Sequence, residues 1–112
     1  MNSVHLVGHV AHTPSVKFEN DGAQLCTFTL AIDEHSYGPE RKLYVLYVPC
    51  TSYGRSAAAC SLLNAEDLVS VQGKLTWRPH KRKCGQEHSE LCVRVQDVAV
   101  LTPVVTATGS NN

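Results

Sequence analysis

RSAAACSLLN, residues 55–64, decides the fold, because it is the one stretch of this 112-residue chain that predicts a helix. It is rich in alanine, the best helix former, and Asn64 is a favourable residue at a helix end. The segments on either side have the alternating or β-branched and aromatic composition of strands. Short strands with a single interposed helix favour a small closed barrel over an antiparallel sandwich. We therefore expect an all-β fold with one short helix.

The strand patterns lie before and after this helix. They cover residues 3–10, 25–33, 43–53, 68–77 and 91–101, with a short return strand in SVKFE, 15–19. Between 15–19 and 25–33, Asp21-Gly22 predicts a hairpin turn, since this pair accepts the positive φ of a tight turn. Pro49 predicts an edge or bulge position in its strand, and Gly73 predicts a bend or bulge.

The composition is that of one globular domain, with 43% hydrophobic and 18% charged residues. Ten basic residues balance ten acidic ones, yet Arg78, Lys81, Arg82 and Lys83 lie within six residues that contain no acid. Such clustering favours a polyanion as partner whatever the net charge. The apolar runs are too short to span a membrane, and the first ten residues do not resemble a signal peptide. Five cysteines without a secretory context indicate reduced thiols in the cytosol or an organelle matrix.

Strand alternation separates the side chains into an outward and an inward set. The outward set is His5 and His9, then Val45, Tyr47, Thr51 and Tyr53, then Gln72, Lys74, Thr76, Arg78 and His80. The inward set contains Phe28, Leu46, Val48, Cys50, Val71, Leu75 and Trp77. Aromatic and cationic side chains thus gather outside while aliphatic ones gather inside. Rings that stack bases beside cations that follow phosphates are typical of a surface for single-stranded nucleic acid.

HKRKCGQEHSELC, residues 80–92, places His80, Cys84, His88 and Cys92 at intervals of four, which raises the question of a zinc site. This interval aligns four ligands only on a helix, and Gly85 with strand patterns on both sides argues against one. We expect no metal and no cofactor, and instead a basic hairpin that contacts phosphates in a salt-dependent way. A metal-binding regulator that uses this stretch is the weaker alternative.

No stretch carries a pattern typical of catalysis. A glycine-rich phosphate loop, a metalloprotease-type histidine motif and a paired-carboxylate setting are all missing from the sequence, and nothing orients a Cys–His pair. We therefore expect a binding protein and not an enzyme.

Three stretches resemble the bacterial single-stranded DNA-binding protein family. They are NSVHLVGHVAHTP at 2–14, SYGRSA at 52–57 and VSVQGKLTWRPHKRKCGQEHSELCVRV at 69–95, and the similarity extends over about residues 2–101. The resemblance implies a five-stranded Greek-key OB-fold barrel over residues 1–101, followed by a short flexible tail, 102–112. It also implies a homo-oligomer, most simply a homotetramer, with a dimer as the alternative.

The resemblance also implies roles for individual residues. Base stacking is expected of Tyr37, Tyr47, Tyr53 and His80. Phosphate contacts are expected of Lys74, Arg78, Lys81, Arg82 and Lys83, and weaker polar contacts of His5, His9 and Arg55. Trp77 is displaced by three residues from the family's stacking position, so we expect a structural or barrel-rim role for it.

The implied function is binding of single-stranded DNA with little sequence preference, in support of replication, recombination or repair. The expected location is the cytoplasm, associated with the nucleoid, with an organelle matrix as the alternative. GSNN stands where the family carries an acidic tail that recruits enzymes, so we expect no recruitment of that kind. The alternative function is that of the tail-less primosomal replication protein N, an OB-fold interaction module that binds single strands more weakly.

Overall fold

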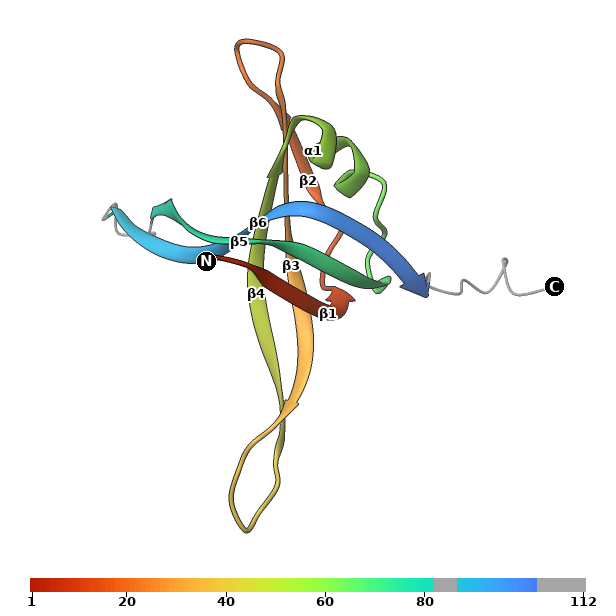
Figure 1. Cartoon of the computed structure of the whole chain (residues 1–112), viewed down its shortest axis with the longest axis vertical. Helices are drawn as coiled ribbons and strands as arrows, with labels where there is room; N and C mark the ends of the chain where they lie inside the picture. The colour runs from red at the N-terminus through yellow and green to blue at the C-terminus, as the bar shows by residue number, and fades with distance from the viewer. Residues whose placement is uncertain (82–86, 103–112) are drawn as a thin grey trace, which may run out of the picture.

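The computed structural model describes residues 1–81 and 87–102. Within these ranges lie six strands and one short helix (Figure 1). They are β1 (Val4–Val10), β2 (Ser15–Phe18), β3 (Gln24–His35), β4 (Leu43–Tyr53), α1 (Gly54–Cys60), β5 (Leu68–Lys81) and β6 (Glu87–Thr102). The expected order of strands and helix is confirmed. The expected flexible tail lies, apart from Thr102, outside the described residues.

Five of the strands close into a barrel. The sheet runs in the order β1-β5-β6-β4-β3-β2, and an additional pairing of β1 with β3 joins its two sides. The ring is therefore β1-β5-β6-β4-β3, with β2 as an extra edge strand beside β3. All pairs are antiparallel except β4 with β6, which meet in parallel at Cys50–Val93 and Thr51–Arg94. This is the connectivity of the OB-fold, as expected.

The turn between β2 and β3 forms where Asp21-Gly22 predicts it. Gly22 adopts φ 87°, and its amide donates to the carbonyl oxygen of Glu19 at 2.8 Å. The Asp21 carboxylate accepts the amide hydrogen of Ala23 at 2.9 Å, which closes the turn from the side. The sequence signal for this hairpin is confirmed.

Helix α1 covers one end of the barrel through Ala57 and Cys60, which are both fully buried. It is shorter than the predicted span 55–64, because the chain leaves the α-helical pattern after Cys60. The amides of Leu62 and Leu63 donate to carbonyls three residues back, and this tightening turns Leu63 into the core. In the part of the chain that the structure describes, no helix is long and apolar enough to cross a membrane.

The core lies inside the barrel and under α1. It is built of small and medium side chains: Val10, Cys26, Phe28, Leu30, Cys50, Ala57, Cys60, Leu63, Val69, Val71, Val93 and Val95. Phe28, Cys50 and Val71 therefore lie inside, as predicted. A register shift between Gln72 and Gly73 marks a β-bulge, which confirms the interpretation of Gly73. A Cβ atom at Gly73 would overlap the carbonyl group of Arg94, so the close approach of the two strands requires glycine.

Four side-chain predictions are wrong, three of them for the same reason. Leu46 and Leu75 are each 46% exposed and Trp77 is 64% exposed, although all three have inward parity. They lie where β4, β5 and β6 extend beyond the closed barrel, as Figure 1 shows for the long strands, so no opposite wall covers them. Thr51, predicted outward, is 5% exposed because β3 and β6 flank it on both sides.

Candidate nucleic-acid interface

Strand β4 presents two tyrosines on the outer face of the barrel. Tyr47 is 62% exposed and Tyr53 is 46% exposed. The β3–β4 register is continuous from one to the other, with Ala31 opposite Tyr47 and Leu25 opposite Tyr53. Residues an even number of positions apart on a regular strand face the same side. Both residues are open to a ligand, and their parity on the continuous strand places the two rings on one side of it.

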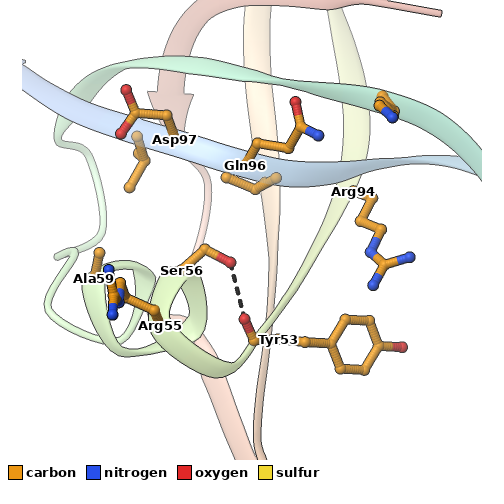
Figure 2. A pocket seen from close by; sticks show the side chains of 10 residues that line it. Tyr53, Arg55, Ser56, Ala59, Arg94, Gln96 and Asp97 are labelled. Atoms are coloured by element: carbon orange, nitrogen blue, oxygen red, sulfur yellow. Dashed lines mark hydrogen bonds between the residues drawn. The ribbon is translucent and has the colours of Figure 1, made fainter.

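A cation covers part of the Tyr53 ring. The guanidinium carbon of Arg94 lies 5.3 Å from the ring centroid, within the range of a cation–π interaction (Figure 2). Arg94 is exposed and lies on β6 between two buried residues, Val93 and Val95. The sequence analysis did not include Arg94 among the binding residues. Its place between two valines of an alternating strand could have indicated that its side chain points outward.

Lys74 stands directly opposite Arg94 in the antiparallel β5–β6 pair. Both side chains are exposed, and paired residues of this kind lie on the same face with Cβ atoms about 5 Å apart. The predicted phosphate-binding residue Lys74 is thus placed beside Tyr53 by way of Arg94.

A pocket of about 650 Å³ opens between α1 and the bulged part of β6. Figure 2 shows Ser56 and Ala59 on the helix side, Gln96 and Asp97 on the β6 side, and the Tyr53–Arg94 pair at one end. Ser56 donates its hydroxyl to the Tyr53 carbonyl oxygen at 3.0 Å, which ties the start of the helix to the end of β4. The cations lining this pocket are Arg55, Lys74 and Arg94, against one carboxylate, Asp97.

A second groove, of about 640 Å³, surrounds Tyr47 and has a different charge. Its lining includes His9 and His12 from the first strand region and the carboxylates of Asp33 and Glu66. His9, predicted as a weak polar contact, therefore lies in the same groove as Tyr47. The two carboxylates were not anticipated, and they disfavour a phosphate close to this ring.

Arg78 is not a free cation. Its guanidinium donates to the Glu90 carboxylate, with Nε and Nη2 both within 2.9 Å of Oε1 and with both side chains about 30% exposed. This pair forms because Arg78 and Glu90 are opposite each other in the β5–β6 register. A phosphate must therefore compete with Glu90 for Arg78.

The other predicted site residues are spread around the barrel. Tyr37 is fully exposed in the loop between β3 and β4, in a small groove with Arg41. The ring of His5 forms a 2.8 Å hydrogen bond with the Ser70 hydroxyl across β1–β5. His80 and Lys81 end β5, and their side chains are not described. Arg82 and Lys83 lie outside the described residues.

No group of three or more His, Cys, Asp or Glu side chains that could hold a metal ion is found among the described residues. The backbone of His80 stands opposite His88, whereas Cys92 stands opposite Thr76. Cys84 lies outside the described residues.

The described cysteines are buried thiols. Burial raises the pKa of the Cys50 thiol to about 12, and burial likewise raises the pKa of Cys26, Cys60 and Cys92. A thiol that stays protonated at neutral pH is a poor nucleophile and a poor metal ligand. These four side chains act as small hydrophobic residues of the core.

The fold and the exposed tyrosines with their cations define an OB-fold barrel of the ligand-binding type. The family model described as the single-strand binding protein family matches residues 1–101, and the chain belongs to this family.

Three relatives show how far the similarity extends. Single-stranded DNA-binding protein A of Bacillus subtilis is 27% identical over 104 residues, which cover 92% of this chain and 60% of that protein. Single-stranded DNA-binding protein 1 of Synechocystis is 27% identical over 103 residues, with coverages of 90% and 84%. Single-stranded DNA-binding protein 2 of Listeria innocua is 27% identical over 115 residues, with coverages of 100% and 72%. The chain thus spans about 60% of the length of the Bacillus relative.

Proposed function

We propose that this protein binds single-stranded DNA with little sequence preference and serves DNA replication, recombination or repair without catalysing a reaction. The observation that carries the proposal is the pair of exposed tyrosines, Tyr47 and Tyr53, on one outer face of β4. Every base has a π-face, so rings displayed in this way bind a strand irrespective of sequence. The names of the relatives point to the same ligand.

The proposed contacts divide by chemistry. Tyr53, Tyr47 and, in the loop, Tyr37 stack bases, and His80 extends this set at the end of β5. Lys74 contacts phosphates beside Tyr53, and Lys81, Arg82 and Lys83, which follow in the sequence, supply further phosphate contacts. Arg78 contributes only when a phosphate displaces Glu90. His5, His9 and Arg55 supply weaker polar contacts.

We also propose a homo-oligomer, with a tetramer as the first expectation and a dimer as the alternative. The part of β4 beyond the barrel carries exposed apolar side chains, and β1 exposes Val7 at 47%. Surfaces of this kind favour association, and several barrels lengthen the path of one strand. Sedimentation equilibrium of the purified chain, with and without an oligonucleotide, distinguishes a tetramer, a dimer and a monomer. The proposed location is the cytoplasm, at the nucleoid, with an organelle matrix as the alternative.

Binding of a labelled oligothymidylate over a salt series, with a duplex of equal length as control, tests the function. Tight binding to the single strand that partly persists at high salt is expected, because stacking does not depend on counterion release. Weak binding that disappears at moderate salt would contradict the proposal and favour a protein-interaction module of the primosomal type.

A further inference from the structure

Two like charges, Lys74 and Arg94, face each other on the β5–β6 ribbon, and among the described residues neither takes part in a salt bridge. Lys74 and Arg94 are directly opposite in register and exposed. The salt bridge found among the described residues joins Arg78 to Glu90 and involves neither of them. Like charges directly opposite on an antiparallel pair destabilise the sheet. An arrangement that costs stability in the free protein is explained most simply by an anion that binds between the two cations.

The Tyr53 ring favours one orientation of the Arg94 side chain. The cation–π contact at 5.3 Å directs the guanidinium towards the end of β4, where the stacking ring is. The ring thereby orients the cation before any ligand arrives, which lowers the entropic cost of binding. A phosphate held by Arg94 and Lys74 would therefore lie within one nucleotide of a base stacked on Tyr53.

The pocket between α1 and β6 begins at the same place. Tyr53, Lys74 and Arg94 belong to its lining, and Ala59, Val95 and Val98 add apolar side chains to it. Its volume of about 650 Å³ is in the range of small-ligand sites. A nucleotide joined to the phosphate at Lys74 and Arg94 has an apolar surface for its base, formed by Ala59 of α1 and by Val95 and Val98 of β6.

We infer that Lys74 and Arg94 jointly hold one phosphate of the DNA strand, and that the nucleotide attached to it occupies the pocket between α1 and β6. This inference rests on the proposed single-strand binding and adds a residue, Arg94, and a path past α1 to it. Because the two Cβ atoms are about 5 Å apart, both cations reach a single phosphate. The two side chains therefore act as a unit.

The salt dependence of oligothymidylate binding tests the shared phosphate. The variants are Arg94→Gln, Lys74→Gln and the double variant, with Lys17→Gln as control, an exposed cation of β2 that does not line the pocket. Each phosphate contact contributes about 0.7 to the slope of log K against log salt. We expect the double variant to lose about 0.7 in slope and about tenfold in affinity at low salt. If the double variant loses about 1.4 in slope, which is the sum of two full phosphate contacts, the two cations bind separate phosphates and the shared site is overturned.

A conservative substitution and a measurement of stability without DNA complete the test. Arg94→Lys keeps the charge and should keep the slope. Without DNA, Lys74→Gln should raise the melting temperature because it removes the repulsion, whereas Lys17→Gln should not. If the wild type binds single strands and the Lys74 and Arg94 variants have the same slope and affinity as Lys17→Gln, the inference is overturned and the proposed function stands. Failure of the wild type to bind any single strand overturns both.

The pocket is tested from the helix side with a matched pair of substitutions. Ala58 and Ala59 are adjacent, exposed residues of α1, and of the two only Ala59 lines the pocket. Ala59→Trp fills the pocket and should weaken oligothymidylate binding about tenfold, with a reduced slope, as in the double variant. Ala58→Trp should bind like the wild type. Equal affinities of the two tryptophan variants would show that the strand does not enter the pocket.

Discussion

The Arg94 guanidinium and the Tyr53 ring form a cation–π pair, with 5.3 Å between the guanidinium carbon and the ring centroid. The pair joins β6 to the end of β4. These two strands pair in parallel at Cys50–Val93 and Thr51–Arg94, next to the contact. One face of the ring is thereby partly covered, while Tyr53 as a whole remains 46% exposed. The free face and the ring edge are what a base can use.

Tyr53→Ala is predicted to weaken binding of a single strand by about five- to 150-fold, because a base–aromatic stack contributes about 1–3 kcal/mol. Tyr53→Phe retains the ring and should remain within about threefold of the wild type. Fluorescence anisotropy with a labelled oligothymidylate measures both. If the alanine and phenylalanine variants bind equally, the ring has no stacking role.

The carboxylate of Asp33 lies in the groove of Tyr47. Asp33→Asn is therefore predicted to tighten binding by about two- to fivefold at low salt and by nothing at high salt, since the repulsion it removes is screened. Glu19→Gln, which neutralises a carboxylate in the β2–β3 turn, is the control and should leave the affinity unchanged. A strand that passes far from Tyr47 would make the two variants indistinguishable.

The ion pair of Arg78 with Glu90 predicts an unequal effect of two neutral substitutions. Arg78→Gln should reduce the salt slope by less than the 0.7 of a full phosphate contact, because Glu90 already neutralises the guanidinium. Glu90→Gln should increase both the slope and the affinity by releasing Arg78 to the strand. Titrations at several salt concentrations measure both slopes, and a full loss of 0.7 in Arg78→Gln would show that the phosphate displaces Glu90.

The barrel was predictable because its strands carry strong local signals. Alternation at 3–10, the Asp21-Gly22 turn and the glycine at the Gly73 bulge depend on a few neighbouring residues, and the structure has all three. The side-chain directions of Tyr47 and Tyr53 followed for the same reason. Local patterns contain this information, since period and turn chemistry are properties of short segments.

Burial was less predictable, because it depends on where the barrel ends. Trp77 and Leu75 have the same parity as core residues. They are nevertheless exposed, because the β5–β6 hairpin continues beyond the strands on the opposite side of the barrel. The pairing of Arg78 with Glu90 and of Arg94 with Lys74 depends on the register across a hairpin, which is constant from Lys81–Glu87 to Gly73–Val95. A one-residue shift changes every cross-strand partner, so the electrostatics of the site could not be read from the sequence.

Gly73→Ala is predicted to destabilise the protein by about 1–3 kcal/mol, because the added methyl group would overlap the Arg94 carbonyl across the bulge. Urea unfolding followed by circular dichroism measures the loss. Gln72→Ala, an exposed change at the same bulge, is the control and should stay within about 0.5 kcal/mol of the wild type. Equal stability of the two variants would mean that the bulge relaxes to admit a side chain.

The buried thiol of Cys50 predicts a loss of stability at alkaline pH. Its pKa rises from about 9 to about 12 on folding, mainly through burial, with smaller contributions from Cys60 and Cys92. Between these values the unfolded chain has lost the thiol proton and the folded chain has kept it. The unfolding free energy therefore falls as the pH rises, by about 1.4 kcal/mol per pH unit for this thiol. Below pH 9 the folded and the unfolded chain both keep the thiol proton, so Cys50 causes no loss of stability there. Urea unfolding from pH 8 to pH 11 should show a shallower decline in Cys50→Ala than in the wild type, and parallel declines would show that Cys50 ionises equally in both states.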